Sequence, residues 1–364
     1  MQLRYRKQVM TAGVAVVALT LALGACSSSG SSSAPGGGSS SSGSASVSGT
    51  LNGSGSTFQL TFQQEAISSF KSVQPNLTVN YGGGGSGKGR TDLAAGTVNF
   101  AGSDSPVPDK EASNFQGKGT VLYFPVIIGP ITLAYNLSGL SKPLQLSAPT
   151  IAGIFSGKIK AWNDPAIKAE NTGVNLPSTP ITLAVRSDSS GTTANFTNFL
   201  VEAAGSAWTL GTSSTIKWPA SSRAGSGNPG VAQIVKSTPG AIGYVDYATA
   251  KASGLSFASV KNKAGSYVAP SDTAASAAAS QASVKPNLTF SAIWAAGATS
   301  YPITYQSWDL VFEKQSSAST AKALRAYLGY LLGDGQKLLS QLGYAPLPAN
   351  IDQMARAQLS KIGS

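Results

Sequence analysis

Histidine is absent from this chain of 364 residues, and Cys26 is its single cysteine. The lack of histidine excludes Ser-His-Asp and Cys-His nucleophilic sites, His-ligated zinc, and the commonest general base near neutral pH. One cysteine cannot form an internal disulfide, so packing alone must hold the fold together. Aspartate and glutamate number only 15, and they form no dense cluster for metal ions. We therefore expect no enzyme, hydrolases and phosphatases included, and neither a cofactor nor a metal ion.

Long apolar runs are also scarce, and the one that stands out lies at the N-terminus. Residues 9–23 are apolar and follow a basic start, but the run is shorter than the ~20 residues of a membrane-spanning helix. It ends in Leu23-Gly24-Ala25-Cys26, which resembles the lipobox of bacterial lipoproteins. We predict a lipoprotein signal peptide at 1–25 and lipidation at Cys26. The alternative is an ordinary signal peptide that contains a cysteine.

The composition changes again after the cysteine. Residues 27–48 are almost entirely Ser, Gly and Ala, which cannot bury enough apolar surface to become ordered, so 26–48 is predicted to be a lipidated tether. The remaining length, 49–364, suggests two domains. The net charge is +11, with the basic residues scattered rather than clustered. That pattern disfavours nucleic acid and anionic membrane as partners and leaves small anions.

Strand and helix patterns alternate along 49–364, as in parallel α/β proteins. A helix is predicted from Ser56 or Thr57 to about Val73, followed by a strand over 77–81 and a glycine-rich run, Gly82–Gly89. Further strands are predicted at 98–101, 131–135, 181–185 and 303–312, and further helices from 91, 147 and about 193.

The glycine-rich run matches part of the pattern of a nucleotide-binding P-loop, G-x-x-x-x-G-K. The following position, which should be Ser or Thr to hold magnesium, is Gly89, so we do not predict a nucleotide site. Glycines at the end of a strand still allow several backbone N–H groups to surround an anion. A plain flexible loop is the alternative.

Two predicted helix starts carry the same kind of pattern. Exposed N–H groups at a helix N-terminus bind anions, and Thr57-Phe58 and Ser190-Gly191-Thr192 both stand at such starts. Arg186 lies just before the second one and offers a planar fork that matches two phosphate oxygens. Asp188 could orient that arginine. Each element also has a simpler explanation: helix capping for the hydroxyls, and turn formation for Asp188 and for Asp104 in Ser103-Asp104-Ser105.

Taken in order, these segments resemble the phosphate-binding lipoprotein of the high-affinity ABC phosphate transporter. The resemblance covers nearly all of 49–364. It is carried by the following segments: Thr57-Phe58, Gly85-Ser86-Gly87, Ser103-Asp104, Phe155 to Trp162, Arg186-x-Asp188-x-Ser190-Gly191-Thr192, Lys217-Trp218-Pro219 and Pro239 to Tyr244.

The resemblance implies an α/β, two-lobed periplasmic-binding-protein fold of type II, with two hinge crossovers and the ligand in the cleft between domains. Lobe 1 would comprise 49–127 and 300–364, and lobe 2 would comprise 128–299. The implied phosphate ligands are Thr57, Phe58 through its N–H, Ser86, Asp104, Arg186, Ser190, Gly191 through its N–H, and Thr192.

The family also implies partners: inorganic phosphate, the membrane permease subunits of an ABC importer, and the outer face of the cell membrane through the lipid anchor. We expect a monomer. Lys88 and Arg90 depart from the family pattern and would add positive charge at the mouth of the cleft. Two alternatives remain, a binding protein for another oxyanion such as sulfate or molybdate, and a surface lipoprotein with an adhesion role.

Asp104 separates phosphate from the other oxyanions. An ionised carboxylate only accepts hydrogen bonds, whereas both physiological forms of phosphate carry a P–OH donor and sulfate carries none. A site built around a ligand hydroxyl can reject the analogue that lacks it by ~10⁴-fold. We therefore expect the carboxylate of Asp104 to accept the proton of phosphate and to repel sulfate.

Overall fold

The structure, a computed structural model, describes residues 47–364. The predicted signal peptide, Cys26 and the tether as far as residue 46 lie outside the described residues. Val47 is buried, and its N–H donates to Oε1 of Gln74 at 3.0 Å. The folded body therefore begins slightly earlier than the predicted end of the tether. Across 47–364, no helix combines the length and the apolar character needed to span a bilayer.

Strands and helices alternate along most of the described chain. The strands are β1 (Gly49–Gly55), β2 (Leu77–Gly82), β3 (Phe100–Ser103), β4 (Val121–Tyr135), β5 (Gln145–Leu146), β6 (Thr182–Arg186), β7 (Arg223–Gly225), β8 (Ala241–Asp246), β9 (Ser256–Phe257), β10 (Ser259–Lys261), β11 (Tyr267–Val268) and β12 (Thr304–Phe312). The α-helices are α1 (Leu60–Val73), α2 (Ser86–Ala95), α3 (Ala148–Phe155), α4 (Pro165–Glu170), α5 (Gly191–Ala203), α6 (Gly227–Ser237), α7 (Tyr247–Ala252), α8 (Asp272–Ala279), α9 (Ala318–Leu332), α10 (Leu339–Leu342) and α11 (Ala349–Gln358). Four 3-10 segments complete the set: η1 (Asp109–Phe115), η2 (Gly205–Ala207), η3 (Asp334–Leu338) and η4 (Leu359–Lys361).

The main sheet has the strand order β2-β1-β3-β12-β4-β8-β6-β7, with β9 beside β4. The pairs that β1 forms with β2 and β3 are parallel, and so are those of β6 with β7 and β8. In the middle, β12 runs antiparallel to β3 and β4, and β4 runs antiparallel to β8. The expected parallel α/β pattern is therefore confirmed in both outer parts, which antiparallel strands connect.

Strand β4 extends further than the sequence predicted, because two prolines interrupt the apparent strand pattern. Its residues up to Pro130 pair with β12, and Ile131–Tyr135 pair with β8. Proline cannot donate to a neighbouring strand and is tolerated at irregular positions. Pro125 lies opposite Trp308, where the pairing with β12 shifts register, and Pro130 lies where β4 changes its partner.

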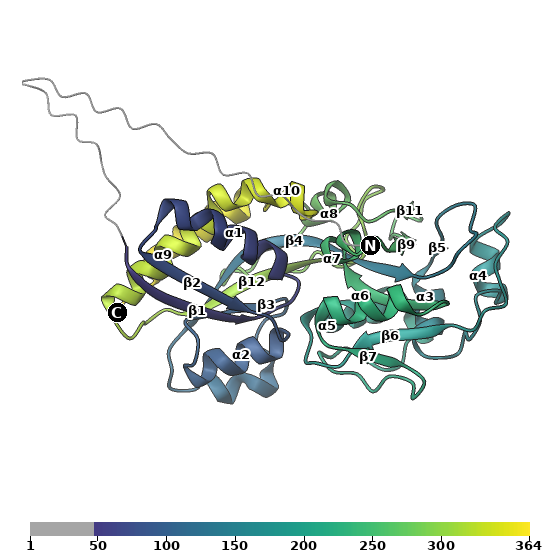
Figure 1. Ribbon diagram of the computed structural model, residues 1–364, viewed down its shortest axis with the longest axis horizontal. Coiled ribbons are helices and arrows are strands. Elements are labelled where there is room, and N and C mark those ends of the chain that lie inside the picture. The colour runs from purple at the N-terminus through teal and green to yellow at the C-terminus, as the bar shows by residue number, and fades with distance from the viewer. Residues whose placement is uncertain (1–46) are drawn as a thin grey trace, which may run out of the picture. The chain divides into compact units, whose positions relative to one another are not determined.

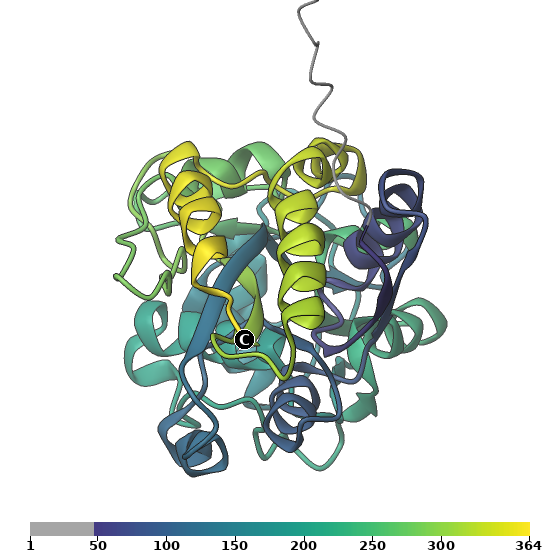
Figure 2. The same ribbon diagram turned by 90° about the vertical axis from the view of Figure 1, so that its left-hand side faces the viewer.

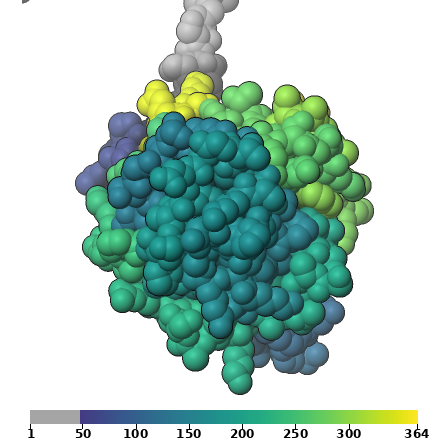
Figure 3. Space-filling model, turned by 90° about the vertical axis from the view of Figure 1, so that its right-hand side faces the viewer, coloured from purple at the N-terminus to yellow at the C-terminus, as the bar shows by residue number. Residues whose placement is uncertain are grey.

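Helices cover both faces of the first part of the sheet. Figure 1 shows α1 and α9 on one side of β1, β2 and β3, and α2 on the other. In Figure 2, α9 and α11 lie side by side over β4, and both contact it. The face in Figure 3 is formed mainly by the middle of the chain, coloured teal to green, which contains β6 and α5. The main apolar core contains residues from Val47 to Ile362, and a smaller cluster includes Val231 and Val235 of α6.

The glycine-rich run corrects one prediction. We predicted it as a loop before a helix from residue 91, but α2 already begins at Ser86. A Cβ on Gly89 would lie 2.6 Å from the carbonyl oxygen of Ser54. The glycine therefore lets α2 pack directly against the end of β1, which a larger residue would prevent.

Candidate anion-binding site

The eight predicted site residues lie at the starts of three helices and at the ends of two strands. Thr57 and Phe58 follow β1 and precede α1, Ser86 begins α2, and Asp104 follows β3. Arg186 ends β6, and Ser190, Gly191 and Thr192 form the start of α5. The fourth helix, α6, begins beside them at Gly227 and Asn228. All eight residues are buried. The carboxyl ends of parallel strands and the helix starts that follow them are a common ligand position in α/β folds.

Three serine hydroxyls surround the carboxylate of Asp104. Ser56 and Ser307 both donate to Oδ1, at 2.5 and 2.6 Å, whereas Oδ2 has only a long bond of 3.3 Å from Ser86. The hydroxyl of Ser86 also accepts from the N–H of Asp104 at 3.1 Å. One carboxylate oxygen is therefore saturated by the protein, while the other retains capacity for a further donor.

Opposing influences act on the charge of Asp104. Burial raises the pKa of its carboxyl above the usual value, while the hydroxyls of Ser307 and Ser56 and the charge of Arg186 act to lower it. Hydrogen bonds to the ionised form favour ionisation, and removal from water opposes it. A further donor that reaches Oδ2 would favour the ionised form of the carboxyl.

Arg186 supplies the positive charge and is almost fully buried. Its Nε and Nη2 donate to the two carboxylate oxygens of Asp188 at 2.8 and 2.5 Å, and its Nη1 donates to the hydroxyl of Thr192 at 3.3 Å. Burial acts to raise the pKa of Asp188, but the hydrogen bonds and charge of Arg186 outweigh it, and the net shift is downward. The predicted orienting role of Asp188 fits this side-on pair, which leaves the outer edge of the guanidinium, Nη1 and Nη2, for an anion.

The start of α5 completes the donor set. The first N–H groups of a helix have no partner within it. Ser190 caps the helix by accepting from the N–H of Thr193 at 3.0 Å, which leaves the N–H groups of Gly191 and Thr192 without a cap of this kind. A Cβ on Gly191 would lie 2.3 Å from Oγ of Ser86 and 2.7 Å from Oδ2 of Asp104. Glycine is therefore required for this close approach of α5 to Asp104.

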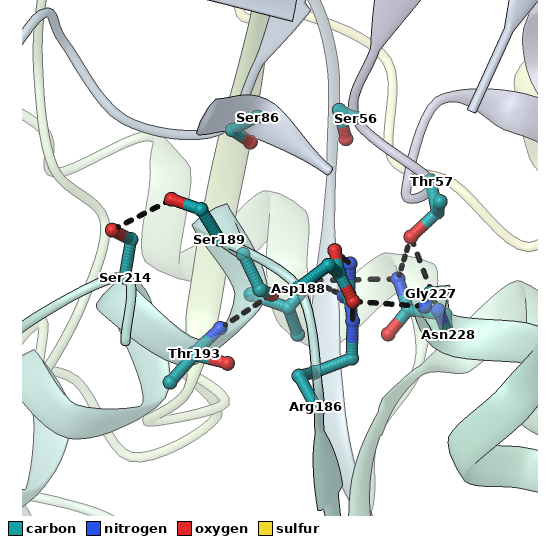
Figure 4. Close-up of polar contacts among 12 residues, drawn as sticks. Ser56, Thr57, Ser86, Arg186, Asp188, Ser189, Thr193, Ser214, Gly227 and Asn228 are labelled. Atoms are coloured by element: carbon teal, nitrogen blue, oxygen red, sulfur yellow. Dashed lines mark hydrogen bonds and ion pairs between the residues drawn. The ribbon is translucent and has the colours of Figure 1, made fainter. Parts of the chain in front are cut away.

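Figure 4 shows Ser56, Thr57 and Ser86 on one side of the site and Arg186, Asp188 and Asn228 on the other. Direct hydrogen bonds join the two sides. The N–H of Gly87 donates to the carbonyl of Ser189 at 2.9 Å, and the side chain of Asn195 donates to the carbonyl of Asp104 at 2.7 Å. The structure thus brings all eight predicted residues together. The N–H of Phe58 donates to Oγ of Ser56 at 3.1 Å.

Known proteins share both the sequence and the fold. Residues 40–334 match the PBP superfamily domain. Phosphate-binding protein PstS of Pasteurella multocida is 36% identical over 314 residues, 85% of this chain and 89% of the relative. Phosphate-binding protein PstS 3 of Mycobacterium leprae is 38% identical over 308 residues, 82% of this chain and 83% of the relative. The chain belongs to this PstS family.

Solved structures confirm the type II periplasmic-binding-protein fold expected of a PstS protein. A high affinity periplasmic phosphate-binding protein bound with phosphate superimposes with a TM-score of 0.70 at 21% identity, over 85% of this chain and 94% of that chain. A phosphate ABC transporter substrate-binding protein from Clostridium perfringens, also with bound phosphate, gives 0.60 at 16% identity, over 82% and 100%.

Residues that the motif did not include also build this PstS site. The sequence indicates Ser56 only as a helix cap, and it points to none of Ser307, Asn195 and Asn228. Ser307 reaches Asp104 because β12 runs antiparallel to β3: Trp308 pairs with Ser103, which places the residue before it opposite the residue after Ser103. No local sequence pattern marks this pairing, because it joins strands far apart in the chain.

Lys88, within the glycine-rich run, and Arg90, directly after it, do not extend the site. Lys88 is exposed and pairs with Asp92. Arg90 is fully buried behind the Asp104 turn, where it binds Glu111 and donates through Nη1 to the hydroxyls of Ser103 and Ser105 at 3.0 and 3.1 Å. The expectation of extra charge at the cleft mouth is therefore wrong for Arg90, whose charge is used to hold the turn. Among residues 47–364, no cluster of acids or other ligating residues could hold a metal ion.

Proposed function

We propose that this protein captures inorganic phosphate and delivers it to an ABC-type importer, without chemical change of the ligand. The observation that carries the proposal is that one buried site contains both a hydrogen-bond acceptor and a positive charge. A carboxylate oxygen with spare capacity, Oδ2 of Asp104, lies against the start of α5, and Arg186 stands on the far side. The PstS relatives support the same ligand.

Phosphate would occupy the space between these groups. The hydroxyls of Thr57, Ser86, Ser190 and Thr192, the N–H of Gly191 and the outer edge of Arg186 would bind its oxygens. The N–H of Phe58 donates to Oγ of Ser56 in this structure and would have to turn from it to join them. Buried anions are tolerated only when their oxygens are hydrogen-bonded. Four helix starts contribute partial positive charge, which spreads the compensation over neutral groups.

The carboxylate of Asp104 would decide between phosphate and other oxyanions. Its Oδ1 already accepts two short hydrogen bonds, so Oδ2 is the oxygen left for the P–OH proton. Sulfate and molybdate have no proton to offer near neutral pH and would face this oxygen acceptor to acceptor.

We further propose the two-lobed division at 49–127 plus 300–364 and 128–299. The change of β4 from β12 to β8 near Pro130 supports a crossover close to residue 128. Because the proposed donors come from both sides, phosphate should favour the closed lobes. Small-angle scattering with and without phosphate would test this, and an unchanged radius of gyration in a sample with confirmed binding would refute the hinge.

The lipid anchor at Cys26, the tether and the monomeric state complete the proposal. The anchor rests on the lipobox pattern that ends in Cys26, and the tether on the Ser/Gly/Ala composition that follows it. The Cys26→Ser variant should leave the membrane fraction for the soluble fraction, as followed by immunoblotting of fractionated cells. Membrane retention of that variant would show that the anchor is something else.

The decisive experiment is calorimetric titration of a chain that spans the described residues, 47–364. Phosphate should bind tightly with one site per chain, and sulfate and molybdate should bind far more weakly. Preference for sulfate or molybdate over phosphate would replace the proposal with another oxyanion. Absence of binding to all three would remove the transport function altogether.

A further inference from the structure

The start of helix α6 contributes a buried amide that joins the two sides of the site. Asn228 is fully buried. Its backbone N–H and its side-chain Nδ2 both donate to Oγ1 of Thr57, at 3.1 and 3.3 Å. The same Nδ2 donates to Oγ1 of Thr192 at 3.3 Å. One amide group therefore contacts a hydroxyl from each side of the site (Figure 4 shows Asn228 beside Thr57).

This contact determines which way the two hydroxyl protons can point. A hydroxyl has one proton to donate and two lone pairs that accept. Both lone pairs of Thr57 are used by Asn228, and those of Thr192 are used by Asn228 and by Nη1 of Arg186. Each hydroxyl can then act only as a donor toward a third group, which is what an anion requires.

The other end of the amide argues against a purely structural role. Oδ1 of Asn228 is buried and has no hydrogen-bond partner among residues 47–364. A buried acceptor without a partner costs about 1–3 kcal/mol. This unpaired acceptor would contribute no stability if the only role of the side chain were to begin α6. A donor from outside the described residues, such as a water that accompanies the ligand, would fill this acceptor.

Packing at the same point supports the assignment. Gly227 has φ +66°, and a Cβ there would lie 3.0 Å from Cγ2 of Thr57. Its N–H donates to Oδ1 of Asp188 at 2.9 Å, so the carboxylate that holds Arg186 also holds the start of α6. The position of Asn228 is therefore coupled to the proposed counter-charge of the ligand.

We propose that Asn228 is a positioning residue for anion binding, which sets Thr57 and Thr192 as donors from opposite sides of the cleft. The proposal rests on the proposed phosphate function. It predicts that affinity depends on the hydrogen-bonding character of residue 228 and not only on its size.

The test compares two variants and a matched control by calorimetry with inorganic phosphate. Asn228→Asp keeps the shape but replaces the donor with an acceptor, so the two hydroxyls would turn toward residue 228 and a second negative charge would face the ligand. We expect at least a ~100-fold loss of affinity at pH 8. Asn228→Ala removes the donor without adding charge, and we expect a ~10-fold loss. The control is Asn171→Asp, another buried amide whose contacts are with the backbone of Gln145 and Ile167, and its affinity should match the parent.

A pH series separates positioning from packing. As the pH falls from 8 to 5, an aspartate at 228 should take up a proton and regain a donor, so the affinity of Asn228→Asp relative to the parent should recover at least ~10-fold. Dividing the affinity of Asn228→Asp by that of the parent at each pH cancels the titration of phosphate and of the groups that both proteins share. These groups include Asp104, Asp188 and Asp246, and burial raises the pKa of Asp246 to about 6. Burial also raises the pKa of Tyr305 far above this pH range, so its hydroxyl stays protonated.

The outcomes are distinct. A parent that does not bind phosphate would overturn the proposed function and, with it, this inference. A parent that binds, with both Asn228 variants within about twofold of it, would overturn the inference alone. So would an affinity loss in Asn228→Asp that is independent of pH and equal to that of Asn228→Ala. Thermal unfolding of each ligand-free variant checks folding, and Asn228→Ala supplies the measurement if Asn228→Asp does not fold.

Discussion

Each side of the anion site carries one aspartate, and the two are held in opposite ways. Asp188 faces a guanidinium that occupies both of its oxygens, and the net shift of its pKa is downward despite burial. Asp104 faces hydroxyls, which fill Oδ1 and leave Oδ2 with one long bond, and burial raises its pKa. The first carboxylate is saturated by the protein and orients a cation. The second keeps an unfilled acceptor.

The comparison shows how one residue type can serve opposite purposes within one site. A carboxylate in a side-on ion pair has little capacity left for a ligand, whereas one among hydroxyls remains an acceptor. In the proposed function, the Asp188 side would therefore supply charge compensation, and the Asp104 side would supply selectivity. Changes on the first side should alter affinity for every anion, and changes on the second should alter the choice among anions.

The largest effect should follow removal of the charge on the first side. Arg186→Ala deletes the cation that faces the ligand and also leaves Asp188 without its partner. We expect phosphate binding to weaken by about 3–5 kcal/mol. Arg186→Lys should recover only part of this, because an ammonium cannot hold Asp188 side-on and still face the ligand. Calorimetry measures both, and near-parental affinity in Arg186→Ala would mean that the counter-charge lies elsewhere.

The second-largest effect should follow replacement of the carboxylate acceptor on the Asp104 side by an amide. In Asp104→Asn, the amide oxygen should stay with Ser56 and Ser307, and the NH₂ should take the position of Oδ2 and donate to an oxygen without a proton. Phosphate should lose only about 1–2 kcal/mol, while sulfate should gain at least ~100-fold in affinity. Competition titrations at neutral pH measure the ratio. If this variant rejects sulfate as strongly as the parent, Asp104 is not the selective group.

A smaller effect is expected behind the Asp104 turn. The double variant Arg90→Met, Glu111→Met removes the buried pair together, so no charge is left alone, but it releases the hydroxyls of Ser103 and Ser105. We expect phosphate binding to weaken by about 1 kcal/mol. The ratio of phosphate affinity to sulfate affinity should also fall. The control is Lys88→Met, which breaks an exposed pair nearby and should change binding by less than about 0.5 kcal/mol. Equal behaviour of the two variants would show that the turn does not need Arg90.

The smallest effect should appear without ligand. The raised pKa of Asp104 means that its protonated form is favoured by folding, so its contribution to stability is present at low pH and is lost as the pH rises through the folded-state pKa. Asp104→Asn cannot ionise, and its stability relative to the parent should therefore increase from pH 4 to pH 8. The gain should be small if the ligand-free cleft opens and hydrates the carboxyl. Chemical denaturation at the two pH values checks the sign, and a relative decrease would contradict it.

Several elements could be predicted because their signals are local. The helix start Ser190-Gly191-Thr192, the strand that ends in Arg186, and the turn at Asp104 are all set by nearby residues, and the structure contains each of them. The eight site residues followed from these signals together with the family resemblance. Strand β4 and helix α2 were predicted too short, because prolines and glycines disfavour regular elements locally and only tertiary packing compensates for them.

The sequence by itself determined which residue types line the proposed anion site: an arginine with its aspartate, hydroxyls at helix starts, and glycines that allow close approach. Tertiary structure decided which atoms of those residues remain free. Ser307 fills one oxygen of Asp104 from a strand far along the chain, Asn228 occupies the lone pairs of two threonines, and Arg90 turns away from the cleft. These choices depend on contacts between residues distant in sequence. The sequence around a hydroxyl or an amide does not show which neighbour accepts its proton, so only the fold determines that partner.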